Sequence, residues 1–101
     1  MKAVTLGRKD DHDKERWDLV PWGPIRDFVR VLTFGAKKYA PNNWQKVPDA
    51  TERYFAAAMR HLTAYRQDEI FDKESKLPHL AHAICCLVFM AWFDRGMRLK
   101  R

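Results

Sequence analysis

The sequence predicts an all-α domain of three main helices that is completed by association with further copies of the chain. Apolar residues recur at intervals of three and four in three separate segments, which is the spacing of helices with a buried face. No strand-like pattern extends beyond residues 2–6. The third segment is apolar almost all round, so it needs more cover than a 101-residue chain can supply, and a symmetric oligomer is the simplest solution.

The length and the composition predict a single domain, because 101 residues with 47% hydrophobic content can bury one modest core. We expect a charged arm, a helical core and a basic tail, at residues 1–20, 21–94 and 95–101. The arm is interpreted as an extended segment that anchors itself through Trp17, Leu19 and Trp22.

The first helix is expected to begin near Pro24, a residue suited to a first helical turn, and to end around Lys38. The turn-forming residues 40–43 follow it. Its periodic apolar positions are Ile25, Phe28, Val29, Leu32, Ala36 and Tyr39.

The second helix has a predicted capping box, in which Asp49 caps the helix and Glu52 reaches back to it. Its expected buried face consists of Phe55, Ala58, Met59 and Leu62. A second stripe carries Arg53, Ala57, Arg60, His61 and Ala64. The small residues between these cations leave room for a ligand, although a solvated arginine face fits the spacing equally well.

The third helix is expected to open near Pro78, to run to about Asp94 and to stop at Gly96. Before it lies the acidic segment 67–77 of an otherwise basic chain. Acidic groups at the C-terminus of a helix oppose its macrodipole, and such broken local rules are frequent at functional sites.

Charge and cysteine content narrow the partners and the compartment. A formal net charge of +6 and a pI of 9.6 favour a polyanionic partner, such as nucleotide phosphates, nucleic acid or an acidic surface. Cys85 and Cys86 are adjacent on a helix and cannot bridge each other, which fits a reducing cytosol. The N-terminus is charged and the apolar run 83–93 is short, so we expect neither a signal peptide nor a membrane span.

Histidines and acids gather around the acidic segment. Glu69, Asp72 and Glu74, together with His61 or with His79 and His82, favour a Mg²⁺ or Mn²⁺ site, because carboxylates prefer hard cations that bridge phosphates. In one alternative the histidines cap helix ends and the acids pair with arginines, namely Arg53, Arg60 and Arg66. In another, His79, His82 and Cys86 form a zinc site, but a cysteine inside an apolar run usually acts as a small hydrophobe.

A second group of residues favours nucleotide binding. Lys37 and Lys38 can hold phosphates, while Tyr39, Asn43 and Trp44 can hydrogen-bond and stack on a base. The alternative is a hydrophobic turn in which the two aromatic residues fill the core.

A series of short motifs follows along the chain: Asp18-Leu19-Val20-Pro21, Phe34-Gly35-Ala36-Lys37-Lys38-Tyr39, Asn43-Trp44, Arg60-His61-Leu62, Glu69, Asp72, Glu74-Ser75, His79-Leu80 and His82-Ala83. Taken in this order, the motifs resemble a phage-borne family, the dATP/dGTP diphosphohydrolase N-terminal domain family, which is similar to the all-α nucleotide pyrophosphatases of the MazG kind. The resemblance covers roughly residues 8–93.

The resemblance implies a helical dimer or tetramer that uses acidic side chains to hold Mg²⁺ and splits a nucleoside triphosphate into a monophosphate and pyrophosphate. It implies metal-facing roles for Glu69, Asp72 and Glu74, with His61, His79 and His82 beside them. It further implies phosphate contacts from four cations and base contacts from three residues, namely Lys37, Lys38, Arg53 and Arg60, and Tyr39, Asn43 and Trp44.

The chain departs from the MazG pattern in one respect. Enzymes of that kind carry paired glutamates on one helix, where this chain has Arg60-His61, and a Glu-x-x-Asp on the next, where it has His79-x-x-His82. Its own Glu-x-x-Asp, at residues 69–72, precedes the third helix.

The departure leaves several functions open. The first is metal-dependent hydrolysis of a purine dNTP to dNMP and pyrophosphate by a cytoplasmic enzyme. The second is capture of a nucleotide without cleavage. A third is binding of nucleic acid through the basic arm and tail, which leaves the acidic and histidine residues without a purpose.

Overall fold

The computed structural model describes residues 5–99. The first four residues of the predicted arm and the last two of the predicted tail lie outside this range. Within it the chain forms three α-helices, α1 (Trp22–Lys38), α2 (Ala50–Arg66) and α3 (His79–Met97), and two short 3₁₀ turns, η1 (Trp17–Leu19) and η2 (Asn43–Lys46). The described residues contain no strand, only an isolated bridge between Phe71 and Pro78. The all-α prediction is confirmed.

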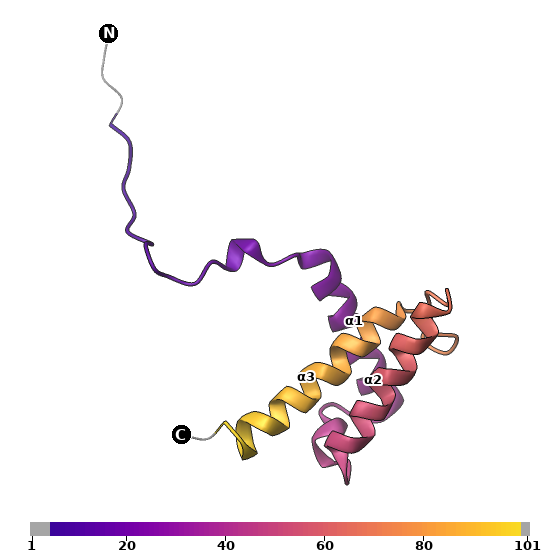
Figure 1. Ribbon diagram of the computed structural model, residues 1–101. Coiled ribbons are helices and arrows are strands. Elements are labelled where there is room, and N and C mark those ends of the chain that lie inside the picture. The colour runs from indigo at the N-terminus through magenta and orange to yellow at the C-terminus, as the bar shows by residue number, and fades with distance from the viewer. Residues whose placement is uncertain (1–4, 100–101) are drawn as a thin grey trace.

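Helix α3 is the centre of the fold, because both α1 and α2 pack against it (Figure 1). Helix α2 packs closely against α3, and its small residue Ala58 is only 2% exposed. Short side chains allow close approach of helices, so the His61 and His79 rings come within contact distance.

The core lies between α1 and α3 and is closed by η2. Its buried members are Val31, Ala81, Cys85 and Phe89, joined by the partly buried Phe28, Leu32, Trp44, Tyr54 and Leu77. Trp44 stacks on Phe89 with ring centroids 4.1 Å apart. This stacking fixes η2, and with it the polar residues on either side, against α3.

Several local predictions need correction. Helix α1 begins at Trp22, two residues before Pro24, and α3 continues through Gly96 to Met97. Asp49 has a left-handed backbone (φ 52°) and its side chain makes no capping hydrogen bond, so the predicted capping box with Glu52 does not form. A capping residue normally has an extended backbone, which lets its side chain reach the helical N–H groups.

Burial also differs from the prediction on two elements. Phe55 and Met59 were expected on the buried face of α2 but are 53% and 47% exposed, while Ala58 between them is buried. The arm does not anchor itself either. Its apolar side chains are exposed, and the segment extends away from the helices (Figure 1). The exposed side chains of this segment are Trp17, Leu19 and Trp22.

Helix α3 is long and apolar enough, by length and composition, to cross a membrane. The expectation that the chain has no membrane span was based on the short apolar run 83–93, whereas the helix that contains this run has 19 residues. The helix also supplies the buried residues His79, Cys85 and Phe89 of this domain, and a core helix of a soluble protein passes the same test.

Candidate functional site

The loop between α2 and α3 places acidic residues against the start of α3. It is held by backbone hydrogen bonds from Asp72 N to Leu77 O (2.8 Å) and from His79 N to Ile70 O (2.8 Å). Lys76 turns the chain with a left-handed backbone (φ 64°), so the loop folds back on itself. As a result Glu69 and Asp72 lie beside residues that come later in the sequence, which confirms the expected acidic loop.

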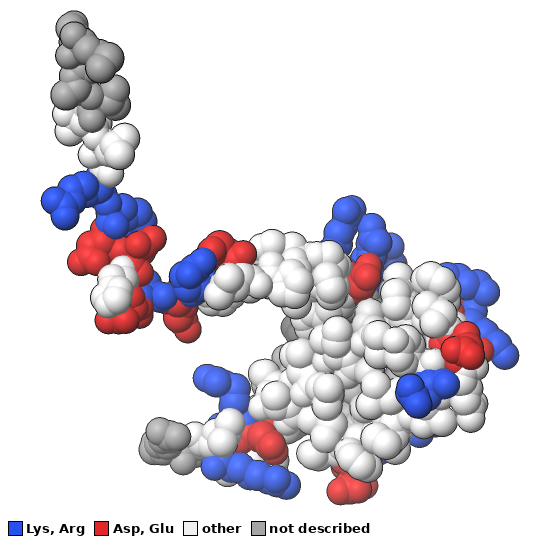
Figure 2. Space-filling model, turned by 45° about the horizontal axis from the view of Figure 1, so that its top comes forward, with Lys and Arg blue, Asp and Glu red and all other residues white. Residues whose placement is uncertain are grey.

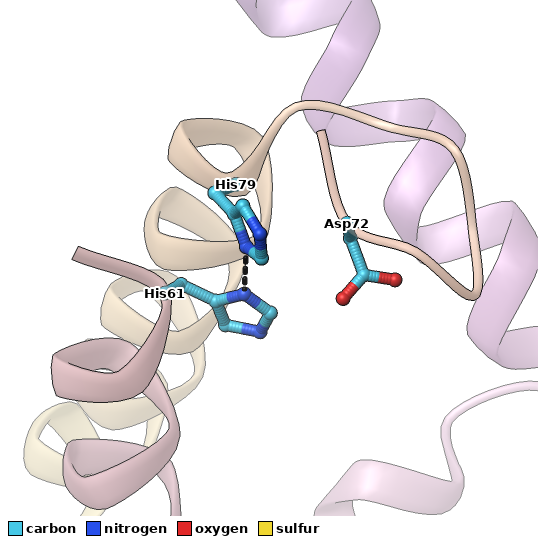
Figure 3. A group of neighbouring side chains, drawn as sticks. All are labelled: His61, Asp72 and His79. Atoms are coloured by element: carbon cyan, nitrogen blue, oxygen red, sulfur yellow. Dashed lines mark hydrogen bonds between the residues drawn. The ribbon is translucent and has the colours of Figure 1, made fainter. Parts of the chain in front are cut away.

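Three polar side chains form a line across the helix pair. The Nε2 atom of His79 lies 2.8 Å from a carboxylate oxygen of Glu69, and its Nδ1 atom lies 2.9 Å from Nδ1 of His61 (Figure 3). His79 is only 5% exposed, which is unusual for a histidine and requires that both ring nitrogens have partners.

His82 lies on the other side of His61. The two rings stack with centroids 4.6 Å apart and an angle of 12° between their planes. The Nε2 atom of His82 is 2.7 Å from Ser75 Oγ and 4.0 Å from Asp72. This contact gives Ser75 a place in the site that the sequence did not predict. In the sequence, only its position beside Glu74 points to it.

Asp72 points from the loop toward the histidines (Figure 3). One of its carboxylate oxygens accepts backbone N–H groups of Glu74 (3.1 Å) and Ser75 (2.8 Å), which fixes the orientation of the group. Ligand atoms of His61, Asp72 and His79 all lie within 4.8 Å of one another, close enough to hold one metal ion. The structure thus brings together residues from α2, the loop and α3.

Burial and charge set the protonation of these groups. Burial, reinforced by the neighbouring imidazoles, lowers the pKa of His61 from 6.5 to about 4, so its ring is neutral at pH 7. Burial also lowers the pKa of His82. Burial alone would raise the pKa of Asp72, but hydrogen bonds from Ser75 and other nearby groups lower it overall. The hydrogen bond from His79 lowers the pKa of Glu69.

His61, Asp72 and His82 open onto a cavity of about 930 Å³ between α1, η2, α2, α3 and the loop. The size is that of a site for a small molecule such as a nucleotide. Most of the predicted substrate residues line it together with part of the predicted metal site: Lys38, Tyr39, Asn43, Trp44, Arg53, Arg60, His61, Asp72, Glu74 and His82. Tyr54 also lines the cavity, although the sequence reasoning did not select it.

Other predicted site residues lie elsewhere. Lys37 is exposed outside the cavity. Glu69 and His79 do not line the cavity either, and the His79 ring contacts His61 through one nitrogen and Glu69 through the other. Trp44 lines the cavity but is also packed on Phe89, as the core alternative describes.

Among the described residues, Glu69 and Glu74 of the loop form no ion pair with an arginine. Glu74 pairs with Lys38 at 2.6 Å, and Glu69 with Lys73 at 3.5 Å as well as with His79. The alternative in which these acids pair with Arg53, Arg60 and Arg66 is therefore wrong for these two residues.

The cysteines are free and buried, as expected from their spacing. Burial raises the pKa of Cys85 to about 12 and that of Cys86 to about 11, so both thiols remain protonated at neutral pH. The residues within reach of one ion are histidine and aspartate and do not include Cys86. This arrangement gives no support to the zinc–thiolate alternative.

Comparison with known proteins places the chain in a family. The family described as "dATP/dGTP diphosphohydrolase, N-terminal" matches residues 5–100, nearly the whole chain. The chain belongs to this family. A protein of Salmonella phage PMBT28 named "dATP/dGTP diphosphohydrolase" is 34% identical over 86 residues, which are 85% of this chain.

The chain corresponds to only a part of that relative. The matched region spans 29% of the relative's length. No solved structure matches the chain. The family assignment made from the motifs is confirmed.

Proposed function

We propose that this chain hydrolyses a purine deoxynucleoside triphosphate to the monophosphate and pyrophosphate. The observation that carries the proposal is the single cavity shared by cationic side chains and by His61, Asp72 and His82. The name of the phage relative supports the same class of reaction.

The cavity offers separate places for phosphates and base. Arg53 and Arg60 on α2 are the cations that would hold the triphosphate, since guanidinium groups bind phosphate oxygens in pairs. Lys38 would contribute as well if the phosphates compete with its ion pair to Glu74. Tyr39, which is 65% exposed at the rim, and Asn43 would receive the base.

A divalent cation is part of the proposal, with Mg²⁺ and Mn²⁺ as the first candidates. The fit of the residues differs between the two. Imidazoles and one carboxylate are donors that Mn²⁺ accepts readily, whereas Mg²⁺ prefers oxygen ligands in a near-ideal octahedron. When bound, the ion would neutralise phosphate charge and assist attack by water on phosphorus.

The chain's own residues would handle the proton. A water oxygen forms a bond to the α-phosphorus, the bond to the bridging oxygen breaks, and pyrophosphate leaves. His82 lines the cavity, and burial lowers its pKa, so its ring is neutral at pH 7 and can accept the proton that the water loses. Asp72, ionised and held by backbone N–H groups, would orient that water or the cation.

The test is incubation of the purified protein with each dNTP and with Mg²⁺ or Mn²⁺, with pyrophosphate as the product measured. Release from dATP and dGTP, abolished by His61→Ala with the fold retained by circular dichroism, supports the proposal. No pyrophosphate from any dNTP, with metal confirmed bound, contradicts it.

A second function, capture of a nucleotide without cleavage, is favoured by one observation. The second helix carries Arg60 and His61 where paired glutamates are expected, so the number of metal-facing carboxylates is small. This function predicts stoichiometric binding that survives chelation, with the nucleotide recovered unchanged. Nucleic-acid binding would instead weaken steeply with salt and gives the cavity no role.

We also propose that the domain works as a homo-oligomer, dimer or tetramer, in the cytoplasm. The oligomer is supported by large apolar side chains that stay exposed on two core helices, including Phe55, Leu87 and Trp92. The cytoplasm is where dNTPs are available, and the free cysteines suit a reducing compartment. No binding to a membrane is proposed.

A further inference from the structure

The position of Glu69 decides which nitrogen of His79 can bind a ligand. The ionised carboxylate accepts a hydrogen bond, so the Nε2 atom of His79, 2.8 Å away, carries the proton. In the neutral ring the Nδ1 atom then has a free lone pair. This atom faces His61 and is shielded from solvent, because His79 is 5% exposed.

His79 and His61 face each other through one ring nitrogen each. Nδ1 of His79 and Nδ1 of His61 are 2.9 Å apart, so they share either a proton or a cation. Two nitrogen ligands at about 2.1 Å from one ion, at a right angle, lie about 3 Å from each other. The spacing of the two imidazoles is therefore already that of neighbouring ligands.

The third ligand comes from the loop. Asp72 offers a carboxylate oxygen within 4.8 Å of the ligand atoms of both histidines and points toward them (Figure 3). Backbone N–H groups hold this carboxylate, and the stacked ring of His82 restricts rotation of His61. Each of the three metal ligands is thus oriented by a neighbouring group that does not itself bind the metal, as is usual around protein metal sites.

We propose that His61, His79 and Asp72 bind a first-row transition-metal ion, of the Mn²⁺ to Zn²⁺ series, in preference to Mg²⁺. Two imidazoles and one carboxylate suit such ions, whereas Mg²⁺ seldom accepts nitrogen. Glu69 is then a positioning residue, which acts through His79, and not a metal ligand. Three protein donors leave coordination positions for water and phosphate.

This inference deepens the proposed function and rests on it for the role of the ion in hydrolysis. Binding of the ion, however, is tested without nucleotide. Co²⁺ serves as the probe, since its visible absorption reports on its ligands. The protein is expected to bind one Co²⁺ with visible bands, which Zn²⁺ abolishes and a large excess of Mg²⁺ does not.

Variants separate the roles of the residues. His61→Ala and His79→Ala should lose the bands. Glu69→Gln should weaken Co²⁺ binding about 10–100-fold and keep the band positions, because the ligands are unchanged. Asp68→Asn is the matched control, since it removes an exposed neighbouring carboxylate and should bind Co²⁺ like the parent. Circular dichroism confirms the fold of each variant.

Other outcomes would overturn parts of this inference. Mg²⁺ displacing Co²⁺ at equal concentration, or His79→Ala retaining the bands, overturns the metal assignment. Glu69→Gln binding with unchanged affinity overturns the positioning role. A protein that binds Co²⁺ but releases no pyrophosphate supports this inference and contradicts only the proposed hydrolysis.

Discussion

At the scale of single residues, the neutral His61 ring links the site to the stability of the fold. Its pKa falls from 6.5 to about 4 in the folded protein, chiefly through burial. Between these two pH values the unfolded chain binds a proton that the folded chain does not, so the free energy of unfolding falls as the pH falls from about 6.5 to about 4. We expect a loss of about 1 kcal/mol between pH 7 and pH 5, after allowance for partial exposure.

Urea denaturation at both pH values measures this loss, and His61→Gln should show a smaller loss than the parent. His82, whose pKa is also lowered, acts in the same direction. His12→Gln is the control, because that histidine is exposed on the arm and should leave the pH dependence as it is. An equal pH dependence in His61→Gln and the parent would show that the ring is not held neutral by burial.

The two arginines of the cavity provide a prediction on substrate affinity. Arg53→Ala and Arg60→Ala should each weaken dNTP binding about 10-fold or more, because each removes a charge-assisted hydrogen bond worth about 1.5–3 kcal/mol. Calorimetric titration with a dNTP measures the change. Arg26→Ala, at an exposed position on α1 outside the cavity, should bind like the parent. If all three variants bind equally well, the phosphates lie elsewhere.

At the scale of elements, α3 carries a glycine that its geometry does not require. Gly96 lies inside the helix, near its end, and a Cβ atom added there would meet nothing within 4 Å. Gly96→Ala should therefore raise the free energy of unfolding by about 0.5 to 1 kcal/mol, because alanine loses less backbone entropy in a helix. Thermal denaturation checks this. An unchanged or lower midpoint would mean that the last turn of α3 is not helical in solution.

The three helices could be predicted from sequence because their apolar spacing and turn residues are local signals. The ends of the helices were harder to predict. Gly96 would end α3 only if its backbone were left-handed, but the helix continues through it to Met97. The residue types predicted a polar site, but they did not predict which of its side chains bond to one another. That Glu69 bonds His79, and that Ser75 bonds His82, depends on how the loop folds back on α3.

At the scale of the whole molecule, the exposed apolar surface is the main unexplained feature of one chain. The view in Figure 2 shows a broad surface without charged residues over the helices, with charged residues mostly around its edge. Leu87 and Trp92 on α3 are 54% and 45% exposed, and Phe55 on α2 is 53% exposed. The apolar pattern all round α3 predicted that this helix needs more cover than its own chain supplies. The spacing on α2 placed Phe55 on the buried face, because an apolar stripe looks the same whether its own chain or a second copy covers it.

A second copy that covers this surface would make the protein in solution heavier than one chain. Light scattering after gel filtration should give a mass of two or four times the 12.0 kDa of the chain. Leu87→Glu should shift the protein toward the monomer, because a buried, unpaired carboxylate at an interface costs several kcal/mol. Leu99→Glu, an exposed leucine beyond the end of α3, is the control and should keep the parent mass. A parent protein that stays monomeric at every concentration would leave these helices uncovered and contradict the oligomer.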